Sequence, residues 1–108
     1  MVNGRNNKFG AIRTTIDGIT FASKAEAKRY AELRLMVMGN VISELELQPK
    51  YPIIINDMKV CTYVADFRYR NDRGKMIVED VKGVKTPVYK LKKKLMASFG
   101  VDIVEITM

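Results

Sequence analysis

Residues 63–83, with the sequence YVADFRYRNDRGKMIVEDVKG, carry the pattern that decides the fold. The stretch predicts two strands joined by a turn, with Asp66 on the first strand and Asp80 and Lys82 closing the second. Because side chains two residues apart on a strand point to the same face, Asp80 and Lys82 project together. Two carboxylates and an ammonium group on neighbouring strands favour a divalent cation site and metal-assisted phosphodiester hydrolysis.

The flanking segments predict one mixed α/β domain at residues 11–108, preceded by a flexible leader at residues 1–10. Residues 41–47 are compatible with either a turn or a short strand. The last strand follows a helix, so it is expected to join the sheet in parallel. In chain order, the predicted elements are a hairpin at 12–21, a helix at 23–38, strands at 53–55, 60–69 and 76–82, a helix at 86–100 and a final strand at 101–107.

The second predicted helix has clear start and packing signals. Thr86 is a suitable N-cap residue, and Pro87 is favoured in the first turn. Four apolar residues then recur at helical spacing and predict the buried stripe of this helix: Val88, Leu91, Leu95 and Phe99. For Tyr51 and Tyr89, core packing is favoured over stacking on nucleic-acid bases.

Composition narrows the chemistry. The chain has no histidine and a single cysteine, Cys61, which excludes histidine-centred nucleophiles, histidine metal sites, an intrachain disulfide and a cysteine zinc cluster. A net charge of +7 favours a polyanionic partner, nucleic acid before an anionic membrane surface. There is no apolar stretch of transmembrane length and no secretion signal, so the expected location is the cytosol of a bacterial host.

Asp66 is the first candidate ligand, because it interrupts an apolar run in a strand that should be mostly covered. The alternative is an edge-strand aspartate paired with a nearby arginine. Asp80 is preferred over Glu79, which should point to the opposite face. Asp80 and Lys82 also lie at the carboxyl end of their strand, where open α/β sheets bind ligands. Alone, the Asp-x-Lys triplet would fit an ordinary polar strand end.

Glu26 has two interpretations. The segment Ser23-Lys24-Ala25-Glu26 fits a capping box, in which the glutamate only caps the helix. Helical spacing also puts Glu26 on the face of Tyr30 and Leu33, so its carboxylate could point inward toward the end of the sheet. Both interpretations can hold in part.

The lysines that follow the acidic strand are candidates for phosphate contact, because they lie near the predicted helix N-terminus. A solvated helix face explains the cluster at 92–94 equally well. The candidate DNA-binding residues are Lys85, Lys90, Lys93 and Lys94.

Taken together, Asp66, the Asp80-Val81-Lys82 triplet and an upstream helical Glu26 resemble the PD-(D/E)XK nuclease superfamily. The resemblance covers about residues 22–107, and it implies a restriction-endonuclease-like core of a helix, a three-stranded antiparallel meander, a helix and a strand, here with an N-terminal hairpin. More narrowly, a set of segments resembles a small family of phage and prophage proteins assigned to that superfamily: FASKAEAKRYAEL, LELQPKYP, YVADFRY, VEDVKG and YKLKKKLM.

The resemblance implies a Mg²⁺- or Mn²⁺-dependent enzyme that hydrolyses DNA. Asp66, Asp80 and Glu26 would be metal ligands, the Val81 carbonyl would complete the coordination, and Lys82 would be the catalytic lysine. Ala65 stands where the superfamily's name has proline. The short chain favours recognition of DNA shape, such as a Holliday junction cut by a homodimer in phage recombination, repair or replication. Two other hypotheses remain: a non-catalytic nucleic-acid-binding protein, and a subunit of a larger phage replication or packaging assembly.

Overall fold

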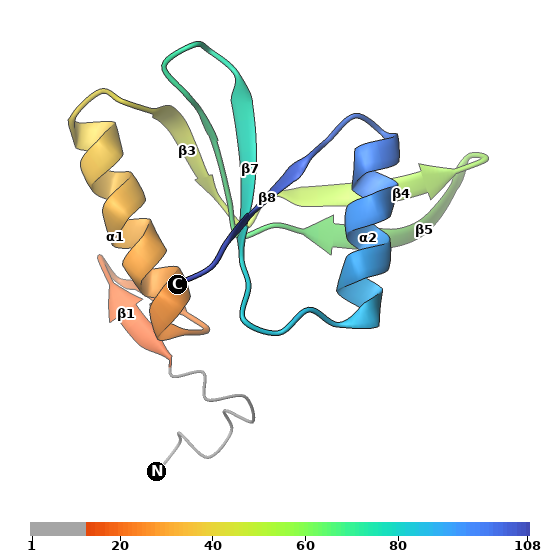
Figure 1. The fold of residues 1–108 in the computed structure, drawn as a ribbon, viewed down its shortest axis with the longest axis horizontal. Helices are drawn as coiled ribbons and strands as arrows, with labels where there is room; N and C mark the ends of the chain where they lie inside the picture. Colours follow the sequence, from red (N-terminus) through yellow and green to blue (C-terminus); the bar gives the residue numbers. More distant parts are fainter. Residues whose placement is uncertain (1–12) are drawn as a thin grey trace.

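The computed structural model describes residues 13–108, so the predicted leader lies outside the described residues (Figure 1). The predicted α/β class is confirmed, and the predicted hairpin and helices are present. The elements are β1 (Thr14–Ile16), β2 (Ile19–Phe21), α1 (Lys24–Met38), β3 (Ser43–Leu47), β4 (Lys50–Ile55), β5 (Met58–Val64), β6 (Phe67–Arg70), β7 (Met76–Val81), α2 (Pro87–Ser98) and β8 (Ile103–Ile106).

A four-stranded sheet in the order β3-β6-β7-β8 forms the centre of the molecule. The first three strands are antiparallel neighbours, and β8 lies parallel to β7, as its position after a helix predicts. The antiparallel meander is therefore present, but its first strand is β3 and not the predicted strand at 53–55. The ambiguous segment at 41–47 provides that strand.

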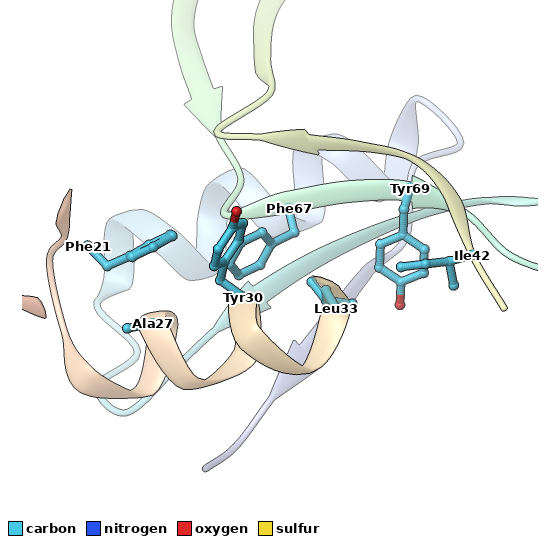
Figure 2. Close-up of a cluster of buried hydrophobic side chains, with 7 residues drawn as sticks. All are labelled: Phe21, Ala27, Tyr30, Leu33, Ile42, Phe67 and Tyr69. Atoms are coloured by element: carbon cyan, nitrogen blue, oxygen red, sulfur yellow. The ribbon is translucent and has the colours of Figure 1, made fainter. Parts of the chain in front are cut away.

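Helix α1 covers one face of the sheet. Ser23 caps the helix by accepting a hydrogen bond from the Glu26 N–H, and the β1–β2 hairpin packs beside its first turns. The side chains between helix, hairpin and sheet form a core of Phe21, Ala27, Tyr30, Leu33, Ile42, Phe67 and Tyr69 (Figure 2). This core fixes the position of α1, and with it the position of Glu26.

Helix α2 covers the other face together with the β4–β5 hairpin. Their shared core consists of Ile53, Tyr63, Ala65, Val78, Tyr89, Met96 and Ile103. The predicted stripe of α2 was wrong in part, because Val88, Leu91 and Phe99 are exposed. The sequence offers two apolar stripes about one residue apart, and the helix buries the one that contains Tyr89 and Met96.

The β4–β5 hairpin, residues 50–64, is a two-stranded arm that leaves the sheet between β3 and β6. The single strand predicted at 60–69 is consequently two strands, broken at Ala65 and Asp66. At the break the chain changes partner: the Ala65 N–H donates to Pro49 O and the Asp66 N–H donates to Glu79 O. Pro52 lies inside β4, which a strand without an outer neighbour tolerates.

Within residues 13–108, neither helix has the length and apolar character needed to cross a membrane.

Candidate active site

Asp66 and Asp80 lie together where β6 begins and β7 nears its end. The Asp66 N–H donates to Asp80 Oδ1 at 2.9 Å, and the Val81 N–H donates to Asp66 Oδ2 at 2.8 Å. The break between β5 and β6 allows this reciprocal arrangement, because it frees the Asp66 backbone to face β7. The structure thus brings together the two carboxylates that the sequence predicted.

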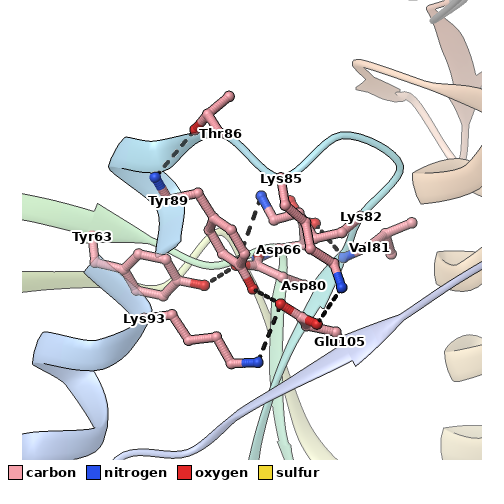
Figure 3. Close-up of polar contacts among 10 residues, drawn as sticks. All are labelled: Tyr63, Asp66, Asp80, Val81, Lys82, Lys85, Thr86, Tyr89, Lys93 and Glu105. Carbon is pink, nitrogen blue, oxygen red and sulfur yellow. Dashed lines mark hydrogen bonds and ion pairs between the residues drawn. The ribbon is translucent and has the colours of Figure 1, made fainter. Parts of the chain in front are cut away.

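Lys82 and Tyr63 complete the surroundings of Asp80 (Figure 3). Asp80 is 1 % exposed, and the Tyr63 hydroxyl donates to its Oδ2. The Lys82 Nζ atom lies 3.9 Å from the same oxygen, as the shared face of positions 80 and 82 predicts. The Asp80 carboxylate is therefore oriented from both sides and faces a positive charge.

Burial dominates the titration of both aspartates. It raises the pKa of Asp80 to about 6, against the opposing effects of Lys82 and of the Asp66 N–H. Burial also raises the pKa of Asp66, with the Val81 N–H and Lys82 acting in the opposite direction. Both groups are thus carboxylates that a cation would stabilise in the charged form.

Glu26 reaches this site from the first turn of α1. Its pKa is raised to about 7, first by burial and then by the negative charges of Asp66 and Asp80, while Lys82 lowers it. The Glu26 N–H takes part in the Ser23 cap, and its carboxylate shares a cavity with Asp66. The Ser23 half of the predicted capping box is therefore present, and Glu26 lines a cavity with Asp66, as the inward-facing interpretation predicts.

Two cavities border the acidic pair. One, of about 220 Å³, is lined by Glu26, Gln48 and Asp66 among others. The other, of about 290 Å³, is lined by Lys82, Lys92, Tyr63 and Tyr89 among others. A larger cavity of about 370 Å³ contains none of the predicted site residues, so volume does not mark this site. One bordering cavity is acidic and the other basic.

Gln48 has an unusual backbone conformation, with φ at +51°. This left-handed conformation is strained for a residue with a side chain. It is held by a hydrogen bond from the Gln48 N–H to Asp66 O at 3.0 Å. No spacing pattern links Gln48 to Asp66, because their proximity depends on the hairpin that separates them.

Glu79 is excluded from the site, as the alternation of side chains predicts. Its carboxylate accepts two hydrogen bonds from the Arg29 guanidinium, at 2.9 and 2.7 Å, and one from the Tyr69 hydroxyl. All three residues lie on the α1 side of the sheet. Glu79 therefore holds α1 against the sheet.

Glu105 was not identified from the sequence. It is opposite Asp80 in the β7–β8 register, and it accepts hydrogen bonds from Tyr89 Oη at 2.8 Å. Its carboxylate also pairs with Lys85 Nζ at 2.9 Å and Lys93 Nζ at 3.1 Å. The available signal was a single acid within the otherwise apolar strand 103–106.

This network changes the interpretation of the candidate DNA-binding lysines. Lys85 and Lys93 are engaged by Glu105, whereas Lys90 and Lys94 are exposed on α2. Only part of the predicted basic cluster is thus free on the surface.

Val81 makes a different contact from the one that the resemblance implies. Its N–H donates to Asp66, whereas the resemblance assigned its carbonyl to a metal.

The sequence matches one protein family over residues 6–104, nearly the whole chain. The chain belongs to the DUF1064 family, which is described as proteins of unknown function. No curated protein matches it significantly. The description of the DUF1064 family gives no function, so the functional argument for this member rests on the geometry of the site.

The donor set of this DUF1064 chain fits a hard divalent cation. Among residues 13–108, no three acidic, histidine or cysteine side chains form a group that could hold an ion on their own. Mg²⁺ is commonly held by one or two carboxylates, with waters and substrate phosphates supplying the remaining ligands. Asp66 and Asp80, with Glu26 in the adjoining cavity, match that mode of binding.

Proposed function

We propose that this chain is a Mg²⁺- or Mn²⁺-dependent endodeoxyribonuclease of the PD-(D/E)XK superfamily. The observation that carries the proposal is the convergence of Asp66, Asp80 and Lys82 at one end of the sheet, with the lysine 3.9 Å from Asp80. An acidic pair beside a lysine provides ligands for a cation and a positive charge for the reacting phosphate. Glu26 adds a third carboxylate from a separate element.

The chemistry divides among the residues as follows. Asp66, Asp80 and Glu26 would hold the ion together with waters and substrate oxygens, and the ion would supply an activated water and polarise a phosphate oxygen. The Lys82 ammonium orients the attacking water and compensates the charge that develops on the phosphate. Tyr63 and the Asp66 N–H hold the Asp80 carboxylate in one orientation, so it needs little rearrangement during the reaction.

For the substrate, branched DNA such as a Holliday junction is the preferred candidate, cut by a homodimer. The net charge of +7 and the exposed Lys90 and Lys94 support an electrostatic contact with the sugar-phosphate backbone. In residues 13–108 both cores pack on one central sheet, so these residues form a single unit without a second module for reading base sequence. This favours recognition of DNA shape over recognition of a long base sequence.

The experiment incubates the protein with labelled four-way junction, flap, single-stranded and linear duplex DNA, each with Mg²⁺, Mn²⁺ or EDTA. Asp80→Asn is the test variant, and Asp102→Asn, an exposed carboxylate, is the matched control. Metal-dependent cutting that is lost in Asp80→Asn and kept in Asp102→Asn is the expected result. The preferred substrate then identifies the structural selectivity.

A non-catalytic nucleic-acid-binding protein is the second candidate. It is favoured by one observation, that both Asp80 oxygens already accept hydrogen bonds, from Asp66 and Tyr63. Binding of DNA without cutting in any metal, with equal affinity for the wild type and Asp80→Asn, would support this candidate and contradict the nuclease.

A further inference from the structure

The Lys82 ammonium lies between a carboxylate and an aromatic ring. Its Nζ atom is 3.9 Å from Asp80 Oδ2 and 4.1 Å from the centroid of the Tyr89 ring. The first distance is near the outer limit of an ion pair, whereas the second is well within the range of a cation–π contact. A lysine side chain has a flexible four-carbon stem, so the ring restricts where the ammonium can rest.

Tyr89 is itself held at its backbone and at its hydroxyl group (Figure 3). It is buried, and its backbone N–H donates to Thr86 Oγ1 at 3.1 Å. Its hydroxyl donates to Glu105 Oε2 at 2.8 Å, on the strand beside Asp80. The ring therefore connects the start of α2 with β8 and lies directly beside Lys82.

The protonation states of Glu105 and Tyr89 maintain the hydrogen bond between them. The hydrogen bond from Lys85, together with those from Tyr89 and Lys93, lowers the pKa of Glu105 to about 2. Burial, and then the hydrogen bond to Glu105, raises the pKa of Tyr89. At neutral pH, Glu105 accepts and Tyr89 donates.

We infer that Tyr89 is a positioning residue for Lys82, and that Glu105, neutralised by Lys85 and Lys93, holds the Tyr89 ring in place. The inference rests on the proposed function, because it takes Lys82 as the catalytic lysine. Without the ring, the ammonium is free to approach Glu26 or Asp66, whose charges it already influences. The ring keeps the lysine on the Asp80 side.

This assignment separates the lysines by role. Lys85 and Lys93 act through Glu105 and Tyr89, so their loss should lower kcat. Lys90 and Lys94 are exposed, and the only role assigned to them is contact with the DNA backbone. Their loss should therefore raise KM with kcat unchanged. A general phosphate-binding role for all four would move KM in every variant.

The test compares Tyr89→Phe, Tyr89→Leu and Glu105→Ala. Tyr89→Phe keeps the ring and should retain kcat within about threefold, whereas Tyr89→Leu should lower it roughly 10- to 100-fold with KM little changed. Glu105→Ala removes the same hydrogen bond as Tyr89→Phe, so its loss of kcat should be similarly small. Lys90→Ala is the control for substrate contact.

A second readout needs no catalysis. In protein with ¹³C-labelled lysine, the ring current of Tyr89 should shift the Lys82 methylene signals, which Lys82→Arg identifies by their absence. The shift should be reduced in Tyr89→Phe, which keeps the ring but loses the hydrogen bond to Glu105, and it should disappear in Tyr89→Leu. If Tyr89→Leu does not fold, a reduced shift in Glu105→Ala carries the same test.

The two proposals fail separately. Unmoved Lys82 signals in Tyr89→Leu, or in Glu105→Ala if the former does not fold, overturn the positioning role even if the protein cuts DNA. A wild-type protein that cuts no DNA with either metal overturns the nuclease, whatever the signals show. Equal loss of activity in Tyr89→Phe and Tyr89→Leu also overturns positioning by the ring.

Discussion

Glu79 and Asp80 are adjacent on β7 and equally buried, each 1 % exposed, yet they face opposite sides of the sheet and different chemistry. Glu79 meets the guanidinium of Arg29 in a two-bond pair and accepts from Tyr69. Asp80 meets neutral donors at hydrogen-bond distance, and its cation, Lys82, lies 3.9 Å away. One carboxylate is fully compensated within the protein and the other only in part.

The difference distinguishes a structural carboxylate from a functional one. A buried charge with a close, bidentate partner is satisfied by the fold itself. A buried carboxylate near other acids, with its pKa raised to about 6, gains stability from an added cation. Burial alone therefore does not mark a candidate catalytic acid; under the proposed function, the incomplete compensation of Asp80 beside a second acid does.

The largest effect is expected from Asp80→Asn. It should reduce DNA cleavage at least about 100-fold, because the substitution removes a ligand charge while keeping the shape of the side chain. Single-turnover cleavage with Mg²⁺ measures this loss. Asp102→Asn, with normal cleavage, is the control, and a loss of less than tenfold would contradict the assigned role of Asp80.

The raised pKa of Asp80 predicts how the thermal stability of Asp80→Asn, relative to the wild type, changes with pH. Because folding raises the pKa of Asp80, its favourable contribution is complete below the unfolded value of 3.8 and is lost as pH rises through about 6. Without metal, Asp80→Asn should therefore gain in thermal stability relative to the wild type as pH rises from 4 to 7, in a series of melts. A constant difference across that range would contradict a raised pKa.

Glu79→Gln should act on stability and leave the chemistry intact. It leaves the mostly buried Arg29 with Glu32 as its remaining charged partner, which is expected to lower the free energy of unfolding by about 3 kcal/mol. Urea denaturation measures the loss, and cleavage at low temperature should stay near normal. Combining it with Arg29→Met, which removes both charges, should recover part of the stability. Loss of cleavage in folded Glu79→Gln would break the contrast between the two carboxylates.

Glu26→Gln tests whether Glu26, the third carboxylate near the site, binds the metal together with Asp66 and Asp80. The pKa of Glu26 is raised to about 7, so protons compete with a cation at this position, and affinity for Mg²⁺ should rise as pH increases through 7. Calorimetric titrations at pH 6 and pH 8 should show a clear increase for the wild type and a smaller one for Glu26→Gln. Identical pH dependence in both would remove Glu26 from the ligand set.

Gln48→Gly should have the smallest effect on stability. Glycine adopts φ near +51° without strain, which should raise the free energy of unfolding by about 0.5–1 kcal/mol. Gln48→Ala removes the same amide but keeps the strain, so it is the matched control. Reduced cleavage in both variants would show that the amide is used, and reduced cleavage in glycine alone would show that the backbone conformation is used.

Local patterns predicted the elements and the central acids of the site. Asp17-Gly18, Ser23 and Thr86 carry signals that depend on a few neighbouring residues, and the predicted turn and caps are present. Asp66, Asp80 and Lys82 followed from strand periodicity across one turn. These predictions needed no knowledge of distant contacts.

The remaining features depend on contacts between distant segments. The break at Ala65 and Asp66 arises because the chain exchanges partners with Pro49 and Glu79, which no local pattern encodes. Glu105 became part of the site through the parallel register that sets it opposite Asp80. The buried stripe of α2 was decided by the core it shares with the arm and with β7 and β8, since the helix itself offered two.

The arm at residues 50–64 also has a consequence for the order of folding. A hairpin forms from neighbouring residues, and once formed it brings Leu47 beside Phe67, which shortens the loop that β3 and β6 must close. The parallel β7–β8 pair must wait for the α2 crossover. In refolding followed by hydrogen exchange, we expect amides at 50–64 to gain protection before those at 103–106. Asp66 would then be placed early, and Lys82, which rests against Tyr89 of α2, would be the last part of the site to settle.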